Sequence, residues 1–455
     1  MTKPLEFWSS PTGFVLATIG AAIGLGSIWK FPYEVGANGG GAFVLFYFLG
    51  LALIVFPLML IELVIGRLGR ADAAYAIANV ATDVGASRLW ALCGVLGVTA
   101  AFIILSFYSV IGGWAIAYAV DTASYGLAGA DARAQQMRFD AMLAAPVKMA
   151  VYHFIYMAVV AFIVARGISR GIEEACKILM PILIGLIVGL GLFSMTQGDV
   201  AATLRFLFRL DPAHLTLRAA LDALGLGFFS IGVGLCLMIT YAAYAGRQVN
   251  LRKVAIITIF GDTAVSITAG FAIFPIVFAE GLDPASGPGL MFVTLPLAFA
   301  RIPGGVYAAL AFFLLLIVAA LASGISMLEM PVAALIRRGW SRHRATAGSA
   351  LACWLCGLAT VLSFNEWATW FPLATIPIFA DATVYYLLDH LTSNIMLPFG
   401  GFTLALFAGW MLPARLFAEE IGIGLRSACI LQFMLRYVIP TCIAIVAFFP
   451  LFLAK

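Results

Sequence analysis

Stretches of roughly 20 apolar residues recur along the whole chain, from Phe14 to Phe452, with short charged segments between them. A helix needs about that many apolar residues to cross the hydrocarbon core of a bilayer. Since 63% of the 455 residues are hydrophobic, only 11% are charged and the mean hydropathy is +1.06, a water-soluble globular protein is excluded. The pattern predicts an all-α polytopic membrane protein that forms one integral membrane unit.

Eleven of these stretches are predicted to be transmembrane helices. Their approximate limits are 12–35, 41–66, 89–124, 149–165, 178–196, 218–244, 254–279, 305–336, 346–363, 390–413 and 427–452. An odd number of spans places the two termini on opposite sides of the membrane. Most of the 26 Lys and Arg residues then lie on the side of the N-terminus. Because short basic loops stay in the cytoplasm, the N-terminus is predicted to be cytoplasmic and the C-terminus outside.

Several functional classes are disfavoured. The net charge of +4 is spread over short loops and forms no clustered basic footprint, so nucleic acid is not an expected partner. Cys353 and Cys356 lack the second ligand pair of a zinc site, and the seven cysteines are interpreted as small packing residues. The histidines are scattered, at His153, His214, His343 and His390. Without a Ser/His/Asp, metal or nucleotide constellation, the chain is not expected to be an enzyme.

Two predicted spans are interrupted by glycine at corresponding places. The interruptions are Gly20–Ser27 in the first span and Ser230–Leu235 in the sixth. Unwound backbone in hydrocarbon leaves polar groups unpaired at several kcal/mol each, and is tolerated where it lines a polar cavity or holds ions. The pattern predicts two inverted five-helix repeats, about 10–197 and about 217–413, an extra helix at about 427–452, and a binding site between broken helices 1 and 6.

A simpler interpretation of the first interruption is also open. Gly20 and Gly24 have the spacing of a small-xxx-small contact between helices, which needs no unwinding. This alternative is preferable for either interruption taken alone. Two interruptions at matching positions favour a binding site.

A long run near the N-terminus is the most distinctive motif. It reads GAAIGLGSIWKFPY from Gly20, and Asn38 begins a second run, NGGGAF. Further motifs are Pro57-Leu58-Met59 with Glu62, Gly66-Arg67, Phe107-Tyr108-Ser109 with Trp114, Phe228-Phe229-Ser230, Ile239-Thr240-Tyr241, AGFAIF from Ala269, and Arg436-Tyr437 before Pro440. Together they resemble the neurotransmitter:sodium symporter family, bacterial branch, over essentially the whole chain. The resemblance implies ten core helices, with substrate and sodium at the midplane.

The resemblance implies sodium-coupled symport of an amino acid into a bacterial cell by alternating access. The implied location is the bacterial inner membrane, with the amino acid and the lipid bilayer as partners. Two alternatives stay open: a proton-coupled transporter of the same architecture in which Asp262 titrates, and a sensor that binds an amino acid without transporting it. The sequence does not specify which amino acid is bound, the number of sodium ions, or the oligomeric state.

The first implied sodium site combines backbone and side-chain oxygens: the Ala22 carbonyl, Ser27, Ser230 and Asp262. The family usually has asparagine where this chain has Ser27 and threonine where it has Ser230. Many relatives have a neutral asparagine where this chain has Asp262. A carboxylate at mid-membrane is costly and is a functional hypothesis by default. The alternative is that Asp262 only accepts a hydrogen bond from a helix end.

Chloride-dependent members of the family hold an anion beside this sodium. The matching positions here are Tyr47, Ser230, Ser266 and, in place of a glutamine, Leu226. Because the glutamine is missing and a fixed negative charge is present at Asp262, chloride is not expected to be required.

The second implied sodium site uses the carbonyls of Gly20, Ile23 and Ala319 and the hydroxyl of Ser323. The family has consecutive hydroxyl residues in this segment. Here Ser323 stands between Ala322 and Gly324, so one oxygen ligand is lost. One or two sodium ions are therefore expected.

The implied substrate pocket is lined by Ala22, Leu25, Gly26, Ile104, Tyr108, Phe229, Ser230, Gly232, Leu235, Ser323, Ser326 and Met327. Amine transporters have aspartate where this chain has Gly24. The absence of this side chain leaves room for the carboxylate of an amino acid beside sodium and the Tyr108 hydroxyl. Leu25 argues for an α-amino acid, and the apolar walls favour an apolar or aromatic side chain. The alternative for Tyr108 and Phe229 is ordinary aromatic packing.

The resemblance also implies gates on both sides of the pocket. Tyr108 and Phe229 would form the outer lid, and Lys30 with Asp389 the outer ion pair. Relatives have arginine at the position of Lys30, and lysine loses the bidentate fork, so this contact is expected to open more easily. On the cytoplasmic side, Glu6 and Arg337 are expected to form a pair of reversed polarity.

Overall fold

The computed structural model describes residues 6–127, 131–284 and 289–453, and every regular element in these ranges is helical. The α-helices are α1 Pro11–Ala22, α2 Phe31–Ala37, α3 Gly41–Gly50, α4 Phe56–Gly69, α5 Ala73–Asp83, α6 Ala91–Tyr125, α7 Ala132–Leu143, α8 Pro146–Ala165, α9 Glu174–Gln197, α10 Val200–Phe208, α11 Leu217–Ile231, α12 Leu237–Ala243, α13 Leu251–Ala279, α14 Leu295–Ala300, α15 Gly305–Arg337, α16 Arg342–Ser363, α17 Val384–Asp389, α18 Leu397–Met411, α19 Ala414–Ile421, α20 Leu425–Phe433 and α21 Ile439–Leu453. Short π-helical segments join several of them into longer rods.

Nine of the helical rods in the described residues are long and apolar enough to span a membrane, and α1 with α2 forms a tenth candidate, bent by 49°. The remaining predicted span, 218–244, is divided into α11, of 15 residues, and α12, of seven. Each part alone is shorter than a span because the chain unwinds between them. The prediction of an all-α polytopic membrane protein is confirmed.

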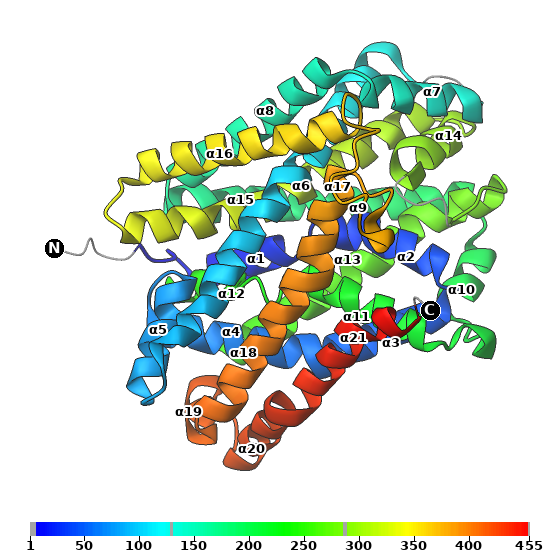
Figure 1. Cartoon of the computed structure of the whole chain (residues 1–455). Coiled ribbons are helices and arrows are strands. Elements are labelled where there is room, and N and C mark those ends of the chain that lie inside the picture. Colours follow the sequence, from blue (N-terminus) through cyan, green and yellow to red (C-terminus); the bar gives the residue numbers. More distant parts are fainter. Residues whose placement is uncertain (1–5, 128–130, 285–288, 454–455) are drawn as a thin grey trace.

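The described N-terminal segment and the far end of α21 lie toward opposite ends of the helix bundle (Figure 1). The N-terminal segment, α5 and α19 lie toward one end of the bundle, here called the N-terminal side. The far end of α21 lies toward the other end, together with α7, α10 and α14. This arrangement is the one expected for an odd number of crossings.

The first helix begins and breaks at places that its sequence explains. The Ser10 side chain caps α1 by accepting a hydrogen bond from the Gly13 amide, and Pro11 occupies the first turn, where its missing N–H costs nothing. The helix ends when Ile23 turns to an extended conformation, and helical structure resumes at Leu25. The break is therefore limited to Ile23 and Gly24, which is narrower than the predicted interruption.

The second break separates α11 from α12 and is longer. Residues 232–236 form turns, whereas Ser230 and Ile231, which were predicted to lie within the break, remain helical. Gly232 and Gly234 have φ angles of +72° and +88°, and Cys236 has +60°. A side chain is strained in this left-handed region, so the two glycines supply the reversal that ends the helix.

The unwound backbone of this second break is paired by a carboxylate of a neighbouring helix. Glu62 on α4 accepts hydrogen bonds from the Gly234 amide, at 2.8 Å, and from the Met238 amide, at 3.2 Å. The Glu62 side chain is fully buried. Since an unpaired amide in hydrocarbon costs several kcal/mol, Glu62 makes the break stable in the membrane.

The broken helices lie at the centre of the bundle. The first helix packs against α9, α13 and α15, and α12 packs against α4. Two of the segments that join predicted spans also contain helical residues. The segment 284–304 contains α14, and residues 285–288 lie outside the described residues. The segment 364–388 lies between two predicted spans, but its last five residues, 384–388, belong to α17 and begin the rod that includes α18.

We predict that Gly234→Ala lowers the apparent Tm in detergent by several degrees. An added Cβ would be strained at this φ and would collide with the Leu397 carbonyl oxygen of α18, so a cost above about 2 kcal/mol is expected. The matched control is Gly225→Ala, because Gly225 lies within α11 and has open space where the Cβ would go. Equal Tm values for the two variants would contradict the packing described for this break.

Candidate functional site

The two helix breaks border one cavity. Its wall comprises Ala21, Ala22, Gly24, Leu25, Gly26, Ile104, Tyr108, Phe229, Ser230, Gly232, Leu235, Leu237, Ser323, Met327 and Leu397. All of the residues predicted to line the substrate pocket are among them except Ser326. The structure thus brings together residues of α1, α6, α11 and α15 that lie up to about 300 positions apart in the chain.

Ser326 lies elsewhere because of its hydrogen bonds. Its hydroxyl accepts a bond from the Tyr241 hydroxyl, at 2.7 Å, and donates to the Ala322 carbonyl, at 3.0 Å. These bonds hold the Ser326 hydroxyl on the N-terminal side of the cavity. Conversely, the predicted lining omitted Ala21, Gly24, Leu237 and Leu397. Leu397 stands on α18, and no local motif indicates that α18 reaches the break, so this wall depends on the packing of distant helices.

One end of the cavity presents hydroxyl and amide groups near the break in the first helix. The Leu25 amide donates to the Tyr108 hydroxyl, at 3.1 Å. A Cβ at Gly24 would come within 2.9 Å of the same hydroxyl oxygen. Because Gly24 has no side chain, this end stays open to small polar groups, and the backbone amides here can interact with an anion such as a carboxylate.

A single carboxylate gathers hydroxyl groups beside the cavity. Asp262, on α13, is fully buried and accepts hydrogen bonds from Ser27 and, at 2.9 Å, from Ser230. The hydroxyls of Ser27 and Ser230 lie 3.0 Å apart. The second oxygen of Asp262 accepts a bond from the Tyr47 hydroxyl, at 3.0 Å. Ser27, Ser230 and Asp262, which were predicted to hold one sodium, therefore form one cluster.

This cluster has the chemistry that an alkali cation requires. Carboxylate, hydroxyl and carbonyl oxygens are the ligands that hard cations prefer. Ala22, whose carbonyl was the remaining predicted ligand, is buried and borders the same cavity. Leu226 and Ser266, which the resemblance implied to match a chloride site, are also buried. A buried carboxylate surrounded by hydroxyls fits a cation and disfavours a second anion beside it.

The residues of the second predicted sodium site also approach one another. The Ser323 hydroxyl, on α15, donates to the Ile23 carbonyl at the break, at 3.2 Å. Ala319 lies one turn before Ser323 on α15 and is fully buried. A Cβ at Gly20 would lie 3.4 Å from the Ala322 side chain, so the two helix backbones are close here. The carbonyls of both helices can thus contribute to one oxygen-lined site.

The predicted outer ion pair is not formed in this conformation. Among the described residues, no ion pair within 4.0 Å joins Lys30 to Asp389. The Lys30 ammonium instead lies 4.5 Å from the centre of the Phe229 ring, and Asp389 accepts a hydrogen bond from Ser393 at 2.9 Å. The negative face of an aromatic ring attracts a cation, so Lys30 is held over Phe229, one of the two residues predicted to form the outer lid.

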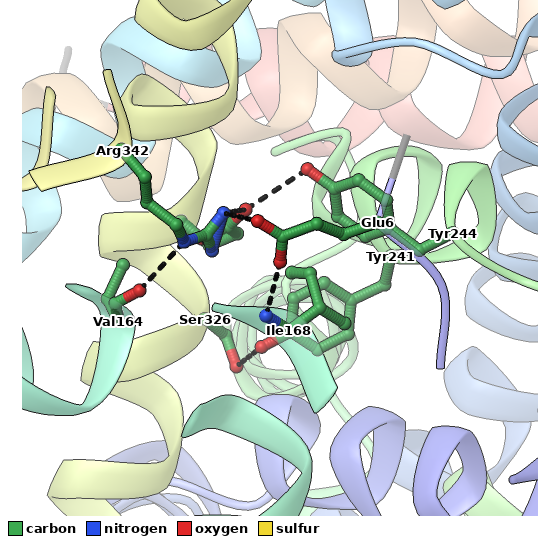
Figure 2. A network of polar contacts seen from close by, with 8 residues as sticks. Glu6, Val164, Ile168, Tyr241, Tyr244, Ser326 and Arg342 are labelled. Atoms are coloured by element: carbon green, nitrogen blue, oxygen red, sulfur yellow. Dashed lines mark hydrogen bonds and ion pairs between the residues drawn. The ribbon is translucent and has the colours of Figure 1, made fainter. Parts of the chain in front are cut away.

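On the N-terminal side the partner of Glu6 is Arg342, not the predicted Arg337. Glu6 lies 3.4 Å from the Arg342 guanidinium and also accepts a hydrogen bond from the Ile168 amide, at 2.7 Å. Figure 2 shows Arg342 at the centre of this network. Arg337 lies with its guanidinium over the Tyr75 ring, at 5.0 Å. The two arginines flank the loop between α15 and α16, and the turn of that loop directs Arg342 inward.

Arg342 also pairs with a carboxylate inside the bundle. Its guanidinium lies 2.6 Å from Glu329, whose side chain is fully buried, and it donates to the Val164 carbonyl at 3.0 Å (Figure 2). Glu329 accepts a further bond from the Tyr244 hydroxyl, at 3.0 Å. The network therefore connects the N-terminal segment to α8, α12, α15 and the start of the α9 rod.

The N-terminal segment is attached at two further points. The Trp8 indole donates to the Tyr241 carbonyl, at 3.0 Å. Ser9 donates both its amide and its hydroxyl to the Glu173 carboxylate, at 2.7 and 2.6 Å. Since Trp8 also packs edge-on against the Tyr241 ring, these side chains close the N-terminal side of the bundle below the cavity.

The sequence matches the family described as Sodium:neurotransmitter symporter family over residues 5–146 and 141–454. The chain belongs to this family. Its members are transporters, and the chain is not an enzyme.

Related members of the symporter family align over nearly their full lengths. An uncharacterized sodium-dependent transporter of Bacillus subtilis, YhdH, is 35% identical over 454 residues, which cover 98% of this chain and 97% of the relative. An uncharacterized sodium-dependent transporter of Haemophilus influenzae is 30% identical over 422 residues, 90% of each chain. The crystal structure of MhsT in complex with L-phenylalanine superposes with a TM-score of 0.88 at 37% identity, covering 97% of this chain and 99% of MhsT.

We predict that Arg342→Gln destabilises the closed N-terminal side by about 3–5 kcal/mol, because it leaves the Glu329 carboxylate buried without a cation. The expected result is a lower Tm in detergent. Arg344→Gln, two residues away on an exposed position of the same helix, serves as the matched control and should leave the Tm unchanged.

The double variant Arg342→Gln, Glu329→Gln should recover most of the lost stability, since both charges are removed together. If Arg342→Gln melts at the same temperature as the unmodified protein, the network does not stabilise this side of the bundle.

Proposed function

We propose that this member of the symporter family is a sodium-coupled symporter that carries an amino acid, with an apolar or aromatic side chain, into a bacterial cell by alternating access. The observation that carries the proposal is the cavity shared by the two helix breaks, with the Asp262 hydroxyl cluster beside it. An amino acid is a zwitterion, so its binding site needs partners for both a negative and a positive charge. The sodium and the amides near Leu25 would attract its carboxylate, and carbonyls of the second break would accept bonds from its amine.

The apolar part of the cavity wall supports the proposed substrate class. Leu25, Ile104, Leu235 and Met327 offer aliphatic surface, and Phe229 adds an aromatic ring. The similar MhsT structure contains L-phenylalanine, and its sequence is 37% identical to this chain. Both observations favour a medium to large apolar or aromatic side chain over a small or charged one.

Sodium dependence is supported by the oxygen ligands and by the names of the relatives in Bacillus subtilis and Haemophilus influenzae. We assign one sodium to Ala22, Ser27, Ser230 and Asp262. A second would take the carbonyls of Gly20, Ile23 and Ala319 and the hydroxyl of Ser323. Each ion would join the broken first helix to a different neighbour, α13 or α15, so binding would favour the conformation in which these helices lie together.

The transport cycle requires that only one side of the cavity open at a time. We propose that the bundle consists of two inverted repeats, about 10–197 and about 217–413, with the N-terminus in the cytoplasm and the chain in the bacterial inner membrane. The network of Glu6 and Arg342 would then be the cytoplasmic closure, and the contact of Lys30 with Phe229 would belong to the outer gate.

The proposal is tested with purified protein in detergent and in proteoliposomes. Thermal shifts with each of the twenty amino acids, measured in sodium and in potassium, should show stabilisation by apolar or aromatic amino acids in sodium only. Counterflow of the stabilising amino acid should then follow in proteoliposomes. Stabilisation that is independent of sodium but changes with pH would indicate proton coupling through Asp262, and binding without counterflow would indicate a sensor.

We predict that uptake is unchanged when chloride is replaced by gluconate, because Asp262 supplies the negative charge beside the first sodium. Asp262→Asn removes this charge while keeping a similar side-chain shape, and should raise the sodium concentration for half-maximal uptake by at least about tenfold, equivalent to about 1.4 kcal/mol. Asp222→Asn is the control, because Asp222 lies on α11 and is less buried than Asp262. Uptake by the unmodified protein that stops in gluconate would contradict this assignment.

A further inference from the structure

A tyrosine outside the cavity is inserted between the helix that carries the proposed second sodium ligands and its neighbours. Tyr156, on α8, is fully buried, and its hydroxyl donates to the Ala320 carbonyl of α15 at 2.5 Å. Ala320 lies between Ala319 and Ser323, the two residues of α15 assigned to the second sodium. No predicted site includes Tyr156, and no motif in the sequence indicates its role.

Two glycines make room for this side chain. A Cβ at Gly324, on α15, would collide with the Tyr156 hydroxyl, and a Cβ at Gly112, on α6, would lie 2.5 Å from the Tyr156 ring. One ring thus fills notches on two helices that pack extensively against each other. Interiors are close-packed, so a side chain fixed on both faces defines the position of α15 relative to α6 and α8.

The hydrogen bond and the ion ligands lie on different sides of one helical turn. Ala319 and Ser323 are four residues apart and share the face of α15 that meets the first helix, where the Ser323 hydroxyl reaches the Ile23 carbonyl. The Ala320 carbonyl is turned from that of Ala319 by about 100°. A bond from α8 to Ala320 therefore restricts rotation of α15 without occupying the ion site.

Restricting this rotation is important for a cation. A hard cation such as Ca²⁺ holds its oxygen ligands within a window of about 0.3 Å. Helix backbone atoms lie about 2.3 Å from the axis, so a rotation of about 15° moves a ligand by about 0.6 Å. Some groups do not touch the metal but hydrogen-bond to its ligands and orient them. Removing such a group typically lowers metal affinity by about 10–100-fold.

We infer that Tyr156 is a positioning residue for sodium at the site between the first helix and α15, acting through the Ala320 carbonyl. The inference rests on the proposed second sodium site. Because this site retains a single side-chain ligand, Ser323, it depends more on backbone carbonyls than on side chains. The orientation of α15 is therefore a direct determinant of its affinity.

The test measures binding of radiolabelled sodium to the full-length protein in detergent, which requires no knowledge of the substrate. Tyr156→Phe keeps the ring in both notches and removes the hydrogen bond, and should raise the sodium concentration for half-saturation by about tenfold. The matched control is Tyr118→Phe on α6. Tyr118 is equally buried, and its hydroxyl has no hydrogen-bond partner within the described ranges. Its removal should leave sodium binding unchanged.

A second pair of variants separates positioning from general destabilisation. Gly324→Ala should weaken sodium binding in the unmodified protein, because the new methyl group displaces the Tyr156 hydroxyl. In the Tyr156→Phe background the hydroxyl is absent, so Gly324→Ala should cause a smaller further loss. Additive losses would overturn the inference, since they would mean that the two positions act independently.

The remaining outcomes distinguish this inference from the function on which it rests. If the unmodified protein binds no sodium, the proposed sodium coupling fails and the inference fails with it. If the unmodified protein binds sodium and Tyr156→Phe binds it with the same affinity, only the role of Tyr156 is overturned. A change in amino-acid affinity at saturating sodium, with unchanged sodium binding, would likewise overturn it.

Discussion

Backbone amides and carbonyls that leave a helix inside a membrane have no water to pair with, and the structure is organised around this constraint. The chain unwinds at Ile23 and Gly24 and again at Gly232–Cys236. At the second break Glu62 accepts bonds from the freed amides, and at the first the Tyr108 hydroxyl accepts one from Leu25. The same requirement that makes unwinding costly concentrates polar groups beside the breaks. The proposed site for a cation and a zwitterion lies where the helices are interrupted.

The two sides of the cavity are bordered by different interactions. On the N-terminal side, Arg342 lies between Glu6 and the buried Glu329, and Trp8 packs against Tyr241. Breaking a buried pair leaves a charge in a poor solvent, so this closure is strong and cooperative. On the opposite side, a cation over an aromatic ring replaces the expected ion pair. Such contacts are worth about 0.5–2 kcal/mol, so this side is held by less energy.

Small residues set the distances on which the proposed ion sites depend. The close approach of Gly20 to Ala322 brings the first helix against α15, and the notch at Gly324 admits Tyr156 on the other face of α15. The helix is therefore fixed from two directions around Ala319 and Ser323. Since backbone carbonyls cannot move without their helix, the affinity of such a site is a property of helix packing as much as of the ligands themselves.

The sequence by itself determined the all-α membrane fold, the family, and the place of both breaks to within a few residues. The length of an apolar stretch and a cluster of glycines are local features of the sequence. Both act through the cost of exposing backbone polar groups to lipid. Only the tertiary structure decided that Glu6 meets Arg342 and not Arg337, that Leu397 closes the cavity, and that Tyr156 supports α15. These contacts join helices far apart in the chain. Which side chain meets which depends on how each rod is rotated and how each loop turns, and residue spacing within one helix does not determine either.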